Sequence, residues 1–274
     1  MNDVSQNAGV RLQPFDAAAR DYDVDFGRLP GVARLRRRVQ SVLFGLFPEG
    51  SRLLELNCGT GTDAIALAMA GRRVHATDAS PSMIGVARTK ARPLNLDQLL
   101  VFDILPFDRT GSLTGTTFDG VFSNMGGLNC VRDLSPIFHS LAAITVPGSY
   151  CVIVLLSGFS LWESLSFLLR GTPRSALRRS SASGVDVPVG NGAVRTYFHS
   201  PAALRKSISP WFRSVRAMAL NVFTPPPGST QAHRQLARVL PVLEWLEDRS
   251  ASLPLIRHGG DHTLFVLQRT MAPQ

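Results

Sequence analysis

Short apolar runs alternate with longer amphipathic segments along most of the chain, and this alternation predicts its main elements. The apolar runs have the length of buried strands and lie at 51–57, 72–78, 98–103, 118–124 and 149–156. Segments with helical spacing separate them, at 62–71, 80–91 and about 131–143. Strands connected through helices form parallel sheets that are covered on both faces. The pattern therefore predicts an α/β fold with a doubly wound, mostly parallel sheet.

Other segments flank or interrupt this alternation. Residues 1–50 contain a polar lead, a helix-prone piece at 15–26 and a basic amphipathic helix at 31–47. Residues 157–195 break the rhythm with an apolar helix, an Arg-rich segment and a Gly- and Val-rich hairpin, and we interpret them as an insertion. The alternation resumes with a capped helix at 200–208, a strand at 214–223, a helix at 231–248 and a last strand at 262–269. A single domain over residues 1–274 is expected.

Composition narrows the class of protein. The 274 residues carry a net charge of +9 and are 45% hydrophobic, which suits a globular core with an anionic partner. Basic repeats interleaved with aromatic residues are lacking, so nucleic-acid binding is not expected. Three cysteines are too few for a disulfide framework or a zinc site, and no metal is expected. The polar N-terminus lacks an apolar signal core, which favours a cytoplasmic location.

One apolar run has the length of a membrane-spanning helix. It covers residues 150–169, but it opens with β-branched residues and contains Gly158 and Glu163. A buried strand that leads into a helix explains this composition better, and a lipid-facing surface remains an alternative.

The stretch NCGTGTDA, residues 57–64, indicates a cofactor site. Gly59, Gly61 and Ala64 fit the pattern Gly-x-Gly-x-x-Gly/Ala, in which the backbone turns tightly between a strand and a helix. Asp78 ends the next predicted strand, where a carboxylate can accept hydrogen bonds from both ribose hydroxyls. Together these features predict a nucleoside cofactor.

The series LLELNCGTGTDA, VHATDASPSMIGVAR and FDGVFSN resembles the motifs of class I S-adenosylmethionine-dependent methyltransferases of the bacterial small-molecule type. The resemblance covers about residues 14–156, with a weaker echo at 197–212 and in the final strand pair. It implies a Rossmann-like, seven-stranded sheet with S-adenosyl-L-methionine as the cofactor. It also implies methyl transfer to an oxygen, nitrogen or carbon atom of a small-molecule or lipid-like acceptor, mainly by proximity and orientation.

The resemblance assigns cofactor-binding positions. In chain order they are Glu55, Asn57, Cys58, Gly59, Thr60, Gly61, Asp63, Asp78, Ala79, Met83, Asp103, Ile104, Asn124, Met125 and Gly126. Glu55 and the turn Cys58–Gly61 would face the methionine part and the sulfonium, and Asp63 would help hold the amino group. Asp78 would bind the ribose, with Ala79 and Met83 beside the adenine. Asp103 would take the adenine amino group, and Ile104 would pack on the ring. Asn124, Met125 and Gly126 would border the reacting methyl group.

Several of these positions have a structural alternative. Asp63 is also suited to cap the following helix, Met83 to fill the core, and Asp103 to open a turn. Cys58 is interpreted as a small packing residue rather than a nucleophile. Many relatives have glycine where this chain has Asn57, and Asn tolerates left-handed backbone better than most residues.

No catalytic base is assigned. The candidate histidines are His139, His199, His258 and His262. His258 and His262 precede the last strand, at an edge that we expect to lie far from the methyl group. Two other functions stay open at this point, a nicotinamide-dependent oxidoreductase and a non-catalytic cofactor-binding protein. The oxidoreductase is disfavoured because about fifty residues precede the first strand and because the turn that contains Asn57 is atypical of dehydrogenases.

Residues 157–195 are predicted to form a lid over the acceptor, together with the N-terminal segment. Apolar residues of the insertion would form a wall, namely Phe159, Leu161, Trp162, Phe167 and Leu168. Positive charge would come from Arg170, Arg174, Arg178 and Arg179. This composition suits an anionic, lipid-like acceptor or peripheral membrane contact. In the alternative interpretation the apolar residues pack on the sheet and the arginines are solvated. The oligomeric state is not indicated.

Overall fold

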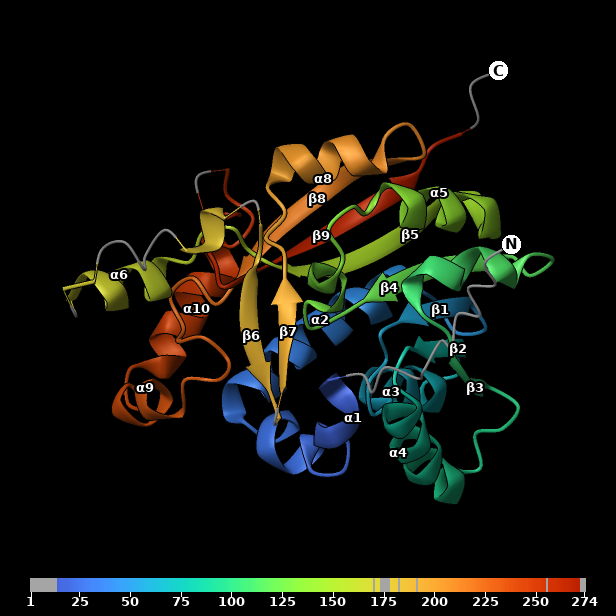
Figure 1. Ribbon diagram of the computed structural model, residues 1–274, viewed down its shortest axis with the longest axis horizontal. Coiled ribbons are helices and arrows are strands. Elements are labelled where there is room, and N and C mark those ends of the chain that lie inside the picture. Colours follow the sequence, from blue (N-terminus) through green and yellow to red (C-terminus); the bar gives the residue numbers. More distant parts are fainter. Residues whose placement is uncertain are drawn as a thin grey trace, which may run out of the picture.

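A seven-stranded sheet in the order β3-β2-β1-β4-β5-β9-β8 forms the centre of the fold (Figure 1). The computed structural model describes residues 14–169, 171–172, 178–181, 183–190, 192–254 and 256–271. The strands are β1 Arg52–Leu56, β2 Arg73–Asp78, β3 Leu100–Ile104, β4 Phe118–Ser123, β5 Thr145–Leu156, β8 Phe212–Leu220 and β9 His262–Arg269. Strands β1 to β5 pair in parallel, whereas β9 is antiparallel to both β5 and β8. The predicted doubly wound, mostly parallel sheet is confirmed.

Helices cover both faces of the sheet. The α-helices in the described part of the chain are α1 Pro14–Ala18, α2 Pro30–Leu46, α3 Thr62–Met69, α4 Pro81–Ala91, α5 Ser135–Ile144, α6 Leu161–Leu169, α8 Pro201–Ile208, α9 Thr230–Gln235 and α10 Leu240–Ser250. One core joins the sheet to α2, α3 and α4, and the other joins it to α5 and α8 (Figure 1). Because successive strand side chains point to opposite faces, Leu53 belongs to the first core and Leu54 to the second.

Serine side chains cap two of the helices. The Ser80 hydroxyl accepts a hydrogen bond from the backbone N–H of Met83 at 3.1 Å, and Ser200 caps α8 in the same way. The helix expected over 231–248 is instead divided into α9 and α10. Pro241 lies in the first turn of α10, where its missing N–H is tolerated, but a continuous helix would have lost a backbone bond there.

The insertion contains α6, the short helix η5 Arg178–Ser180 and an antiparallel hairpin of β6 Val185–Val189 and β7 Gly192–Thr196. The hairpin contacts α1, while α6 projects away from the sheet (Figure 1). The apolar run at 150–169 is the end of β5 followed by α6, as the alternation predicts. Among the described residues, no helix is long and apolar enough to cross a membrane.

Candidate functional site

A cavity of about 1070 Å³ lies at the carboxyl ends of β1, β2 and β4. It brings together most of the predicted positions, namely Glu55, Asn57, Cys58, Gly59, Thr60, Asp63, Asp78, Ala79, Met83, Asn124, Met125 and Gly126. Parallel strands end at one edge of the sheet, so the polar side chains that follow them meet there. Gly61, Asp103 and Ile104 are not part of the lining.

The turn between β1 and α3 contains three residues in left-handed backbone conformation. Asn57, Gly59 and Gly61 have φ angles of +49°, +54° and +74°. The Asn57 side chain also has a structural role, since its Nδ2 donates to the Asn124 carbonyl at 2.8 Å and its Oδ1 accepts from the Ser123 hydroxyl at 2.5 Å. The departure from glycine therefore ties the turn to the end of β4.

The two glycines of the turn have different surroundings. A Cβ on Gly59 would meet no other atom within 4 Å, and Gly59 lines the cavity. A Cβ on Gly61 would lie 2.8 Å from Phe102 Cε1 and 2.9 Å from Ala87 Cβ. Gly59 leaves space in front of the turn, whereas Gly61 lets α3 pack against β3 and α4.

Asp78 is held against the turn. Its Oδ2 accepts from the backbone N–H of Gly59 at 2.8 Å, and its Oδ1 accepts from the backbone N–H of Ser80 at 2.9 Å. Burial raises the pKa of Asp78 above its ordinary value, although these two donors oppose that rise.

Glu55 is a buried acid with one oxygen that has no hydrogen-bond partner. The residue is 2% exposed, and its Oε2 makes no hydrogen bond within the described part of the chain. Burial, reinforced by the nearby Asp63 carboxylate, raises the pKa of Glu55 well above its usual range. Such a group fits a ligand that brings a positive charge or a strong donor.

Asp63 joins three elements. Its carboxylate accepts from Arg36 Nη1 at 2.5 Å, from Gln40 Nε2 at 2.8 Å and from Asn124 Nδ2 at 2.9 Å. It does not cap α3, because the capping position is Gly61 and no side chain caps that helix. The alternative interpretation of Asp63 as a helix cap is therefore wrong. Its bonds fix α2 and the end of β4 beside the turn.

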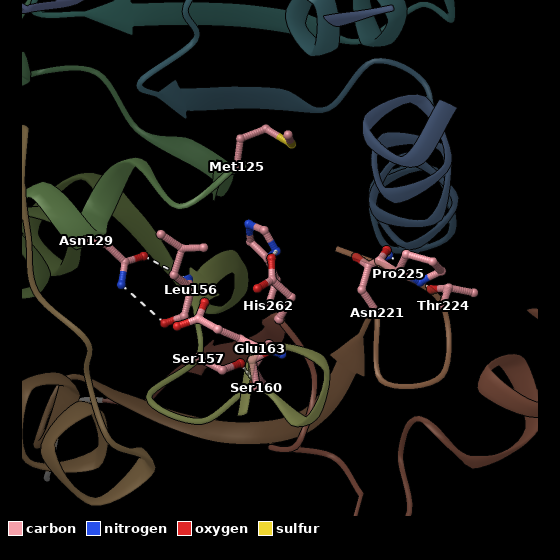
Figure 2. Close-up of polar contacts among 12 residues, drawn as sticks. Met125, Asn129, Leu156, Ser157, Ser160, Glu163, Asn221, Thr224, Pro225 and His262 are labelled. Atoms are coloured by element: carbon pink, nitrogen blue, oxygen red, sulfur yellow. Dashed lines mark hydrogen bonds and ion pairs between the residues drawn. The ribbon is translucent and has the colours of Figure 1, made fainter. Parts of the chain in front are cut away.

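The opposite wall begins where β4 ends. Met125 and Gly126 have φ angles of +59° and +75°, and the Asn124 side chain accepts from the Met125 backbone N–H at 2.7 Å. Asn129, in the short helix η4 Gly127–Cys130, bonds both backbone groups of Leu156 (Figure 2). Its Nδ2 also donates to the carbonyl of Tyr197. These contacts fix the wall to the end of β5.

Asp103 and Ile104 lie outside the cavity. Asp103 Oδ2 is 2.7 Å from Nε2 of His75, and Ile104 is 51% exposed. Phe102 packs in the core, so the following side chain points away from it, and the chain returns to the cavity only at residues 105–108. This segment was not among the positions predicted from the sequence, although its Leu-Pro-Phe run begins two residues after a predicted strand end.

The N-terminal segment covers the cavity from the side of α4. Asp23, in the short helix η1 Asp23–Gly27, accepts from the Thr60 hydroxyl at 2.6 Å and from Lys90 Nζ at 2.6 Å. Tyr22 lines the cavity, and burial raises the pKa of its hydroxyl to about 12, against the opposing effect of Arg36. Tyr22 and Asp23 were not among the site residues predicted from the sequence.

The insertion contributes its hairpin rather than its helix to the cavity. Hairpin residues in the lining include Val187, Val189 and Val194. The side chains expected to form an apolar wall, Phe159, Leu161, Trp162, Phe167 and Leu168, are not in the lining. These residues therefore form neither the predicted wall of the acceptor site nor the alternative layer packed on the sheet, because α6 projects from the sheet.

The arginines of the insertion form ion pairs. Arg179 is 8% exposed and binds Glu163 Oε2 and Asp261 Oδ1, each at 2.6 Å, while Arg178 binds Glu163 Oε1 at 2.6 Å. Burial would raise the pKa of Glu163, but the two arginines lower it below its ordinary value. Neither arginine lines the cavity, so the expected positive surface facing an acceptor is not formed by them. Arg170 and Arg174 lie outside the described residues.

His262 lines the cavity, although the edge before the last strand was expected to lie far from the methyl group. The reason is the direction of β9, which is antiparallel to β5 and pairs His262 with Leu156. The first residue of β9 therefore lies at the edge where the parallel strands end. Asp261 precedes it in the lining, and burial would raise the pKa of that acid, but His262 and the Arg179 guanidinium hold it well below its usual range.

A family model described as methyltransferase domain matches residues 53–148. An S-adenosyl-L-methionine-dependent Diels-Alderase of Talaromyces variabilis is 35% identical over 91 residues, which cover 32% of this chain but only 31% of that protein. A demethylmenaquinone methyltransferase of Mycobacterium sp. (strain KMS) is 30% identical over 182 residues, which cover 64% of this chain and 73% of that protein.

Among solved structures, the CcbJ methyltransferase from Streptomyces caelestis has the same fold. Its TM-score is 0.63 at 17% sequence identity, and the match covers 94% of this chain and 98% of that chain.

Proposed function

Because the chain belongs to the class I S-adenosylmethionine-dependent methyltransferases, we propose that it transfers a methyl group from S-adenosyl-L-methionine to a small, largely apolar organic acceptor. The cofactor would occupy the cavity between the Gly-rich turn and the end of β4. The acceptor would lie beside it, under the hairpin and the N-terminal segment.

The main support for this proposal is the Glu55 carboxyl oxygen that has no hydrogen-bond partner among the described residues. S-adenosylmethionine has a sulfonium and an ammonium group, and both favour a site with carboxylates. Glu55, Asp63 and Asp78 all line the same cavity. A nicotinamide dinucleotide brings a negatively charged pyrophosphate to the glycine turn, and it has no ammonium group from which Glu55 could accept. The charge of the site therefore supports the methyl donor over the dinucleotide.

The lining residues suit the parts of this cofactor. Asp78 would accept from the ribose hydroxyls, and Glu55 from the amino group. Arg36 lines the cavity and is suited to the carboxylate of the methionine part. Met83 and residues 105–107 offer apolar contacts for the adenine in place of Asp103 and Ile104. When bound, the cofactor supplies an electrophilic methyl group with a good leaving group, so the protein mainly orients the two reactants.

The acceptor side is mostly apolar. Phe15, Phe26 and Ile137 line it together with valines of the hairpin. This lining supports an apolar or lipid-like acceptor. A lipid surface fits the exposed face of α6, because Leu161, Leu165 and Leu168 are 45%, 49% and 56% exposed. Co-sedimentation with anionic and neutral vesicles tests that contact.

Titration calorimetry with S-adenosylmethionine, S-adenosylhomocysteine and NAD tests the cofactor. We expect binding of the first two and none of NAD. Transfer of labelled methyl groups to an extract of the host tests the reaction. One relative is by name a Diels-Alderase that depends on the same cofactor. Binding of S-adenosylmethionine without any labelled product would therefore reject methyl transfer and favour a non-methylating role.

A further inference from the structure

The cavity has the opposite charge to the chain as a whole, which carries a net charge of +9. Among the described residues that line the cavity, Arg36 is the only lysine or arginine, and it forms an ion pair with Asp63. Four acids of the lining have exposed side chains, and we call them the acidic rim. They are Asp21, Asp25, Asp108 and Asp133. The solvent-facing part of the cavity is therefore negative in a basic protein.

The acidic rim is assembled from segments that are distant in the sequence. Asp25 lies in η1, Asp108 in the short helix η3 Phe107–Leu113, and Asp133 just before α5. Within the described part of the chain, none of the four acids forms an ion pair. The arginines next to them in the sequence are not part of the lining. The charge of the rim is therefore available to a ligand.

The N-terminal segment also lines the cavity with aromatic side chains. These are Phe15, Tyr22 and Phe26, and the rings of Tyr22 and Phe26 are 5.4 Å apart between centroids. Elsewhere, arginines lie over aromatic rings, as Arg249 does at 4.5 Å from the centroid of Trp245. No described arginine or lysine lies over the three rings of the cavity. Since an aromatic face attracts a cation, these rings are suited to a positively charged ligand.

A buried polar side chain lies at the inner end of the acceptor side. His262 is 6% exposed, and its imidazole points toward Met125 (Figure 2). Its Nδ1 makes no hydrogen bond to any described residue, although Asp261 Oδ2 is 3.1 Å away. Asp261 lines the cavity too, whereas its partner Arg179 does not. A ligand that brings an N–H donor here would therefore meet an imidazole and a carboxylate, not a guanidinium.

We propose that the acceptor is an organic cation, with an apolar body and an ammonium group. The acidic rim would attract the cation, and the rings of the N-terminal segment would hold it. The valines of the hairpin would contact its apolar body. This inference rests on the proposed function, because it takes the cofactor to occupy the rest of the cavity. It replaces the anionic acceptor expected from the sequence, whose charge would face the carboxylates of the rim.

Two fluorescent probes with the same apolar group and opposite charges test the inference without the natural acceptor. They are naphthylmethyl-trimethylammonium and naphthylmethanesulfonate, each titrated into protein saturated with S-adenosylhomocysteine. We expect the cation to bind at least about tenfold more tightly than the sulfonate. Added salt should reduce this preference, because the rim is exposed. Equal binding of the two probes, or tighter binding of the sulfonate, overturns the inference.

Substitutions separate the charge of the rim from the aromatic contact. The double variant Asp25→Asn/Asp133→Asn should bind the cation about three- to tenfold more weakly, without weaker binding of the sulfonate. Phe26→Leu keeps an apolar side chain and should weaken binding of the cation about two- to fivefold. The matched controls are Asp97→Asn and Phe159→Leu, because both residues are exposed and lie outside the lining. Unchanged affinity for the cation in both the double variant and Phe26→Leu overturns the inference.

The same titrations distinguish failure of this inference from failure of the proposed function. If wild type does not bind S-adenosylhomocysteine, the proposed function is refuted. If wild type binds S-adenosylhomocysteine but shows no preference for the cationic probe, only the cationic acceptor is refuted. Affinity for S-adenosylhomocysteine should be unchanged in the double variant, because the rim acids are assigned to the acceptor. Loss of that affinity would place the two acids at the cofactor and overturn the inference.

Discussion

Asp78 and Gly59 are joined by a hydrogen bond of 2.8 Å from the backbone N–H of the glycine to the carboxylate. The acid expected to bind the ribose therefore also closes the turn against β2. This double role changes what a substitution at Asp78 should do, because the turn and the ligand share one side chain.

Asp78→Ala should weaken S-adenosylhomocysteine binding and also loosen the turn. The loss of a charge-assisted hydrogen bond to the ligand costs about 1.5–3 kcal/mol, which is about ten- to a hundredfold in affinity. Calorimetry and urea unfolding of the same variant measure the two effects. Unchanged affinity in a folded Asp78→Ala protein would contradict the ribose role.

Gly59→Ala should mainly lower cofactor affinity, whereas Gly61→Ala should mainly lower the stability of the fold. Both positions have positive φ, so both variants bear a similar backbone penalty of about 1–2 kcal/mol. Gly61→Ala adds the overlap with Phe102 and Ala87 and should lose a further 1–3 kcal/mol or so of stability. Gly59→Ala should lose mainly cofactor affinity, since its Cβ would enter the space of the cavity. Equal losses of stability in the two variants would refute this distinction.

Glu55→Gln should change how stability depends on pH. Because its pKa is raised, Glu55 stays protonated in the folded chain at pH values where it has already lost its proton in the unfolded chain. The stabilisation from this group is complete below the unfolded pKa of about 4.3 and is lost as pH rises toward the folded pKa, by about 1.4 kcal/mol per pH unit.

The permanently neutral Gln should therefore make the cofactor-free protein more stable at neutral pH and flatten this slope, while it weakens S-adenosylmethionine binding. Urea unfolding over a pH series measures the slope. The raised pKa of Asp78 acts in the same direction in both proteins, so the difference between them reports Glu55. A slope that is identical in wild type and variant would be inconsistent with a buried, protonated Glu55.

Arg179→Met and Arg178→Met form a matched pair. Arg179 is buried against two carboxylates, and its removal should cost about 3–5 kcal/mol of unfolding free energy because the buried Asp261 carboxylate loses its guanidinium partner. Arg178 is largely solvated, and its removal should cost at most about 1 kcal/mol. Thermal and urea unfolding test the pair. Comparable losses would mean that the buried ion pairs add little to the stability of the insertion.

Most of the sheet and the cofactor turn were predictable from the sequence because both depend on local signals. The Ser80 cap and the Gly-rich turn each follow from a few neighbouring residues. The position of Asp103 was not predictable, because a shift of one residue in a strand moves a side chain to the other face. That side chain points to His75 rather than to the cavity.

The acceptor side was harder to predict because it is assembled from distant segments. His262 reaches the cavity only through the antiparallel pairing of β9 with β5, and no local pattern reveals that direction. The ion pairs of Arg179 likewise depend on Asp261, which is 82 residues away. An Arg-rich stretch alone gives no sign that one of its members is buried.

The antiparallel place of β9 also affects how the chain is synthesised. Strand β5 lies between β4 and β9 in the sheet, but β9 comes much later in the sequence. Ser157, which directly follows β5, bonds Thr263 of β9 across 106 residues. A ribosome releases β5 long before its second neighbour exists, and the end of that strand from Cys151 to Leu155 consists of apolar residues. During this interval one edge of β5 is unpaired, and its free backbone N–H and C=O groups are available to strands of other chains. Translation speed between these two strands therefore sets how long the nascent protein is exposed to aggregation.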